Sequence, residues 1–226
     1  MDHLSPEPKL LRSLGKLARG LSALFWGLPA ALIICAETAR VNFIQPFEIA
    51  PALIANALLL FGLWQMGSFQ KQERPWRAAL DRAKLLGLVN LGLCPFLFWF
   101  NRMPGQNYFR AAVVVLVISA SLFLFNLNVV LKQLGAMLPD ETLRHDLNHF
   151  TALNRWLVAV WLLFIAAVIL VSEFANLSAL APENLAGLQS AADLVFLCLG
   201  LPPLAVTMAL LWKTKEVIFD SVFGSK

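Results

Sequence analysis

The two histidines His145 and His149 form the arrangement in this sequence that comes closest to a metal site. Residues four apart share one face of a helix, so two imidazoles at this spacing can bind one metal ion. Asp146 lies between them, but no cysteine or further histidine lies nearby to complete a tetrahedral zinc site. The alternative is a solvated helix whose polar face holds two histidines, and we expect no bound metal and no cofactor.

A second group of candidates consists of the amide and hydroxyl side chains inside long apolar runs. Such groups can line a path for a neutral solute, or they can join membrane helices by hydrogen bonds worth less than about 1–2 kcal/mol each. The group comprises Asn56, Asn90, Ser119, Ser121, Asn126, Asn128 and Thr207. No Lys, Arg, Asp or Glu lies within these runs (residues 21–36, 49–69, 85–100, 111–131, 156–171 and 194–212). This argues against a proton-relay pump or a voltage sensor, since both place ionisable groups in the membrane.

Enzyme chemistry finds little support in the sequence. The three histidines, His3, His145 and His149, all lie outside the apolar runs, whereas an intramembrane metalloprotease, a di-iron desaturase or a bis-histidine haem protein needs histidines at defined positions. A Gly-x-Ser-x-Gly elbow, a Gly-rich phosphate loop and an Asp-rich metal motif are also missing. We therefore expect a protein that is not an enzyme, and a membrane-embedded enzyme ranks third among the functions considered.

The apolar runs themselves predict the fold. Hydrophobic residues make up 59% of the chain and charged residues 14%, against about 25% charged in a typical soluble domain. Six runs approach the roughly 17–25 residues needed to cross a hydrocarbon layer about 30 Å thick. We expect an all-α, polytopic membrane protein in which residues 1–226 form one domain with six transmembrane helices. The expected spans lie near 21–39, 49–69, 85–101, 111–131, 156–172 and 194–212.

The distribution of positive charge predicts the orientation of these spans. Of the 18 Lys and Arg residues, 15 lie in residues 1–20, 70–84, 132–155 and 213–226, and the other three are Arg40, Arg102 and Arg110. Because short cytoplasmic segments collect Lys and Arg, both termini are expected in the cytoplasm, and the spans form three in-out-in hairpins. This topology accounts for the net charge of +4, so no nucleic-acid partner is expected. The expected location is a bacterial cytoplasmic (inner) membrane.

Local patterns predict how the segments outside the spans are built. Residues 1–20 have the alternation of an amphipathic helix on the membrane surface, with a turn at Gly20 into the first span. The connector at 70–84 is expected to restart as a helix at Pro75 and to run into the third span, where Pro95 predicts a kink.

The second half of the chain contains similar signals. The polar connector at 132–155 is expected to become helical after Pro139 and to lead into the fifth span. Pro182 can begin a short surface helix in the outer loop, and residues 213–226 form a cytoplasmic tail whose apolar side chains rest on the membrane.

Two functions follow from this architecture. The first is a transport protein, either channel-like or a permease subunit, for a neutral or small solute; it requires Asn56, Asn90 and Asn126 to face one water-accessible cavity. The alternative is a non-catalytic structural or assembly subunit. Its expected partners are membrane lipids, further copies of the chain or other membrane subunits.

Overall fold

The computed structural model describes residues 8–40, 49–69, 72–103, 105–137, 141–177 and 182–223. Within these ranges it describes all side chains except those of residues 8–11, 40, 143, 172–177, 182–198 and 221–223. Helices joined by short turns make up these ranges, which confirms the expected all-helical class. The helices are α1 (Pro8–Arg40), α2 (Ala50–Met66), α3 (Arg74–Leu93), α4 (Pro95–Arg102), α5 (Asn107–Met137), α6 (Glu141–Leu177) and α7 (Pro182–Phe223). Only Cys94 separates α3 from α4, so the described ranges form six helical rods.

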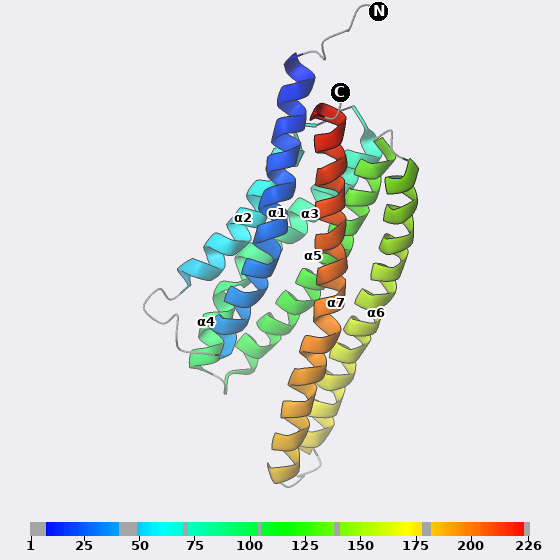
Figure 1. Ribbon diagram of the computed structural model, residues 1–226. Helices are drawn as coiled ribbons and strands as arrows, with labels where there is room; N and C mark the ends of the chain where they lie inside the picture. Colours follow the sequence, from blue (N-terminus) through cyan, green and yellow to red (C-terminus); the bar gives the residue numbers. More distant parts are fainter. Residues whose placement is uncertain are drawn as a thin grey trace, which may run out of the picture.

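The rods run in alternating directions along one bundle (Figure 1). The most extensive packing joins α1 to α2, α3 to α5, and α6 to α7, and α5–α6 and α1–α7 contacts connect these pairs. The start of α1 and the end of α7 lie at the same end of the bundle, which we call the N/C end (Figure 1).

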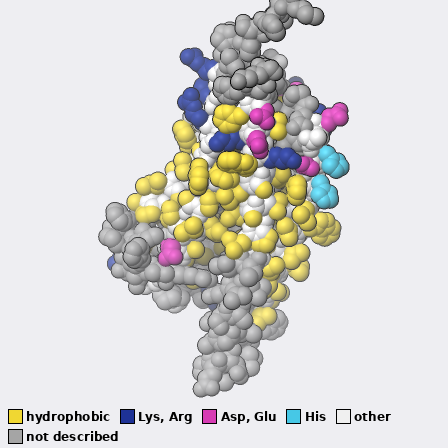
Figure 2. Space-filling view, viewed as in Figure 1, with side chains coloured by type: hydrophobic (Ala, Val, Ile, Leu, Met, Phe, Trp, Pro, Cys, Tyr) yellow, Lys and Arg dark blue, Asp and Glu magenta, His cyan; other side chains and the backbone are white. Residues whose placement is uncertain are grey.

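Among the residues that the structure describes, four rods are long and apolar enough to cross a membrane, which is compatible with a multi-pass membrane protein. They cover Arg12–Ala39, Arg74–Arg102, Asn107–Met137 and Arg144–Val171, and α2 is a shorter apolar helix of 17 residues. On the visible face, hydrophobic side chains cover the middle of the bundle, and most charged side chains and the histidines gather toward the N/C end (Figure 2).

The turn expected at Gly20 was wrong, because α1 continues through this residue. Gly20 instead lies where α1 crosses α2: a methyl group added to it would be 2.7 Å from the carbonyl oxygen of Gly62. Leu17 and Leu21, expected to face the membrane surface, are fully buried in the bundle. Small residues let membrane helices approach closely, so Gly20 serves helix packing and not a change of chain direction.

The end of the chain also differs from the expectation. A single helix, α7, runs from Pro182 through Pro202 and Pro203 to Phe223, in place of a short surface helix and a separate tail. Thr214 and Ile218 are buried in it, so the part of residues 213–226 with described side chains packs against the bundle. Val217 and Ile218 pack against the core, whereas Phe219 is 41% exposed.

The two connectors behave as expected. Trp76, Leu80 and Ala83 are buried on one face of α3, which begins at Arg74. The expected kink lies at Pro95, whose missing N–H ends the helical hydrogen bonding of α3. Residues 132–137 of the second connector end α5, and residues 141–155 form the first turns of α6, which continues without a break into its apolar part; Pro139 lies outside the described residues.

One large apolar core extends along the bundle into the N/C end. There it contains buried side chains from segments outside the six expected spans, among them Leu17, Trp76, Leu147 and Ile218. A smaller cluster at the opposite end includes Ala52, Cys94, Leu97 and Leu116. The polar connectors therefore contribute one face each to the same core as the apolar runs.

Candidate functional site

Three polar side chains meet inside the bundle where α5, α6 and α7 come together. Asn128, Asn154 and Thr207 are each at most 1% exposed. The Nδ2 atoms of Asn128 and Asn154 donate to Thr207 Oγ1 at 2.8 and 3.0 Å, and the Thr207 hydroxyl donates to the carbonyl oxygen of Pro203 at 2.7 Å. Asn128 Nδ2 also donates to the carbonyl oxygen of Leu124 at 2.8 Å. We call Asn128, Asn154 and Thr207 the amide–hydroxyl cluster.

Local helix chemistry explains why Thr207 is oriented in this way. A threonine hydroxyl in a helix commonly donates to the carbonyl four residues earlier. Pro203 occupies that position here, and Pro203 itself has no N–H to give to the carbonyl of Leu199. The carbonyl of Leu199 therefore lacks its helical hydrogen bond, one turn before the carbonyl that the Thr207 hydroxyl binds.

Asn128 and Thr207 were among the predicted polar residues, but Asn154 was missed. Its position next to Arg155 had placed it in the polar connector at 132–155. The buried stripe of α6 could have identified it, since its members recur at helical spacing. They are Leu147, Asn154, Val158, Trp161 and Ile165.

Some oxygen atoms near the cluster are buried without a hydrogen-bond partner. They are Asn128 Oδ1, Asn154 Oδ1 and the hydroxyl of Thr151, which lies one turn before Asn154 on α6. All three can accept a hydrogen bond, and burial of a polar group without a partner costs free energy.

Three of the other predicted residues, Asn56, Ser121 and Asn126, make local hydrogen bonds. Asn56 is buried and donates to the carbonyl of Ala52 at 2.9 Å and toward Cys35 Sγ at 3.8 Å. The remaining bonds run within single helices, from Ser121 to the carbonyl of Val117 and from Asn126 to that of Leu122.

The transport hypothesis required three asparagines to share one cavity. Asn56 and Asn90 are buried, whereas Asn126 is half-buried and its hydrogen bond lies at an exposed site. Asn90 Oδ1 and Ser119 Oγ are buried without a hydrogen-bond partner. Asn126 therefore differs from the other two in its exposure.

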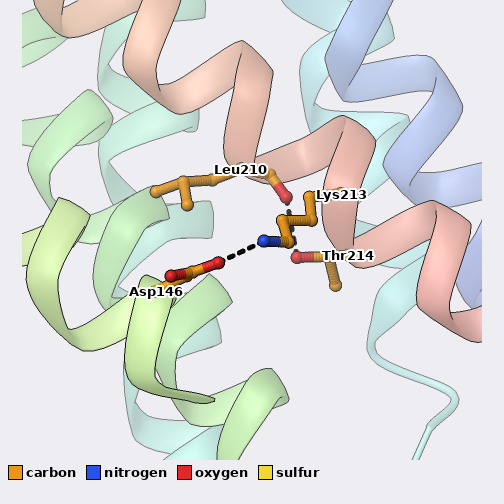
Figure 3. Close-up of polar contacts among 4 residues, drawn as sticks. All are labelled: Asp146, Leu210, Lys213 and Thr214. Atoms are coloured by element: carbon orange, nitrogen blue, oxygen red, sulfur yellow. Dashed lines mark hydrogen bonds and ion pairs between the residues drawn. The ribbon is translucent and has the colours of Figure 1, made fainter. Parts of the chain in front are cut away.

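The histidine pair lies on the surface of α6. His145 and His149 are both exposed, and the carboxylate of Asp146 forms an ion pair with Lys213 of α7 (Figure 3). In the part of the chain that the structure describes, no group of three or more His, Cys, Asp or Glu is placed to hold a metal ion. Asp146 thus joins two helices, and the pair has no third ligand among those residues.

A shallow pocket of about 340 Å³ lies at the N/C end between α3 and α5. It is lined by Glu73, Pro75, Trp76, Gln133, Ala136 and Met137. One carboxylate and one amide in this lining do not form a nucleophile–base pair or a metal site.

Comparison of the chain with models of protein families, with curated proteins and with solved structures gave no match.

Proposed function

We propose that this chain is a six-span membrane protein with both termini in the cytoplasm and with its helices paired as three hairpins. The alternating rods and the charged N/C end support this topology. Trp64, Trp156 and Trp212 are exposed toward the N/C end, and Trp99 and Tyr108 are exposed toward the other, as interfacial aromatic residues require. A bacterial inner membrane is the proposed location, and cytoplasm-side labelling of both termini tests the orientation.

Within that membrane, the proposed role is a non-catalytic subunit that binds another membrane helix along α6. The observation that carries this proposal is the outer face of α6, where small and large residues alternate at spacings of four and three. The residues are Ala152, Trp156, Ala159, Leu163, Ala166 and Leu170, and all six are exposed. We call them the α6 seam.

The α6 seam has the geometry of a helix-packing surface. Spacings of four and three keep residues on one side of a helix that packs at a shallow left-handed angle against another. Alanines at every seventh position let the partner's backbone approach, and the large residues fill the spaces between its side chains. Only 17% of the most apolar stretch of α6 is buried, against 44% for α5, so the bundle leaves room for a partner.

The internal polar residues support a packing role better than a transport role. The amide–hydroxyl cluster joins three helices, and Asn56 and Asn126 bond to carbonyls of their own helices. Transport of a neutral solute is the second candidate. One observation favours it: Pro202 and Pro203 interrupt the hydrogen bonding of α7 next to this cluster, and broken helices recur at transporter binding sites.

Enlarging the seam tests the subunit proposal. Ala159→Leu and Ala166→Leu place bulk where a partner backbone would pack, so both should reduce the mass of the particle extracted in mild detergent, measured by native mass spectrometry. Ala57→Leu is the matched control, because Ala57 is an exposed alanine on α2. Loss of the larger particle in the control as well would contradict a specific seam.

Reconstituted liposomes separate the two functions. A non-transporting subunit leaves the osmotic response of liposomes to glycerol and urea unchanged. Solute-specific flux that is abolished by Asn128→Leu would favour transport and refute the subunit role.

A further inference from the structure

We propose that the three unpartnered oxygens around the amide–hydroxyl cluster form a binding site for one small guest, either a water molecule that donates hydrogen bonds to them or a monovalent cation that they coordinate. The site comprises Asn128 Oδ1, Asn154 Oδ1 and Thr151 Oγ1, which come from α5 and α6 and are buried without a hydrogen-bond partner. Buried polar atoms in proteins are nearly always paired, and ordered water supplies the partner where protein does not. This site is independent of the proposed subunit role.

The missing partners cannot be supplied by rotating the amides. The Thr207 hydroxyl hydrogen is directed to the carbonyl of Pro203, so Thr207 can only accept from the two asparagines. Each amide must then turn its nitrogen toward Thr207 and its oxygen away. Exchange of O and N in Asn128 would lose two hydrogen bonds, because the same nitrogen also donates to Leu124.

The chemistry of the site defines the guest. The two amide oxygens offer only lone pairs, and the Thr151 hydroxyl can accept as well as donate a hydrogen bond. No group in the site carries a positive charge, so the site favours a neutral donor or a single positive charge over an anion. Water can donate two hydrogen bonds, and hard cations prefer oxygen ligands.

The position of the site in the chain allows access from one side. Asn128 lies four residues, about 6 Å of helix, from Lys132, and Asn154 is followed directly by Arg155. The site thus lies about one helical turn inside the N/C boundary of the apolar region. A guest that enters from water on that side crosses little of the membrane.

A high-resolution structure of the full-length protein in nanodiscs provides the direct test. We expect non-protein density within hydrogen-bonding distance of Asn128 Oδ1 or Asn154 Oδ1. Absence of density at both oxygens, at a resolution that shows other ordered waters, would overturn the proposal.

Thr151→Val provides a thermal test that does not require such a structure. The substitution keeps the shape of the side chain and removes the hydroxyl. An empty site would gain stability from loss of an unpaired group, whereas an occupied site loses a guest contact. We expect the melting temperature to fall by about 2–4 °C.

The control is Thr214→Val on α7, because the buried Thr214 hydroxyl donates only within its own helix, to the carbonyl of Leu210 at 2.7 Å. A Thr151→Val shift no larger than that of this control would also overturn the proposal.

Melting in sodium, potassium and choline chloride at equal concentration then identifies the guest. A cation raises the wild-type melting temperature in one salt only, and Thr151→Val reduces that rise. Equal melting in all three salts, together with density, assigns water.

Discussion

Replacement of Gly20 by alanine tests whether α1 and α2 depend on direct contact between their backbones. The added methyl group would lie 2.7 Å from the carbonyl oxygen of Gly62, 2.8 Å from Met66 Cγ and 3.2 Å from the Met66 nitrogen. The flexible Met66 side chain can move, but two of these three atoms belong to the backbone of α2. The two helices must therefore separate to accommodate the change.

Two opposing effects set the change in the free energy of unfolding that Gly20→Ala causes. Alanine favours a helix over glycine by about 1 kcal/mol, and overpacking of a close contact costs about 1–3 kcal/mol. Gly15, on the same helix, has no atom within 4 Å of an added methyl group, so Gly15→Ala receives only the favourable effect. The two variants should therefore differ by the packing cost alone. At about 2–4 °C per kcal/mol for a chain of this size, the melting temperature of Gly20→Ala should lie roughly 2–12 °C below that of Gly15→Ala.

Thermal unfolding in detergent, followed by the fluorescence of the seven tryptophans, measures this difference. Gly92→Ala is a second control, because an added methyl group there also meets nothing within 4 Å. If Gly20→Ala stabilises the protein as much as Gly15→Ala does, the backbones of α1 and α2 do not meet at Gly20 and Gly62 as closely as described.

Three further changes have expected outcomes that melting curves can check. Thr207→Val removes the acceptor of two buried amides and should destabilise the protein by about 1–3 kcal/mol, and an unchanged melting temperature would mean that the cluster contributes no stability. Lys213→Ala breaks the ion pair with Asp146, but both side chains are partly exposed (44% and 31%), so the loss should be about 0–1 kcal/mol and should shrink with added salt. Gly135→Ala would place a methyl group against Leu147 Cδ1, so α5 and α6 must repack, at a cost of about 1–3 kcal/mol; stabilisation would show that this side chain moves freely.

Helical periodicity in the sequence identified apolar stripes on both connectors, and the structure buries them in part. Trp76 and Leu80 on α3 and Leu147 on α6 lie in the core, whereas Phe150, on the same stripe as Leu147, is 38% exposed. Pro95 likewise marked the break between α3 and α4, because the missing N–H acts locally.

The sequence could not specify which partner covers a face. The stripe containing Leu17 and Leu21 suits a membrane surface and a neighbouring helix equally well, and Gly20 suits a turn and a close helix crossing equally well. The presence of Gly62 at the facing position of α2 decides between them, and that pairing exists only in the assembled bundle. Asn154 was missed for the related reason that a polar residue beside an arginine resembles a solvated connector until its neighbours on α7 are known.

The core that passes from the middle of the bundle into the N/C end has a consequence for how the protein unfolds. In the proposed membrane placement, Leu17, Trp76, Leu147 and Ile218 pack in a part of the bundle surrounded by water, while the rest of the same core is surrounded by hydrocarbon. Water makes burial of the first part favourable, whereas lipid tails are as apolar as the residues that they replace. Urea should therefore loosen the four helices at the N/C end while the membrane part stays helical, so that one continuous core unfolds in two steps.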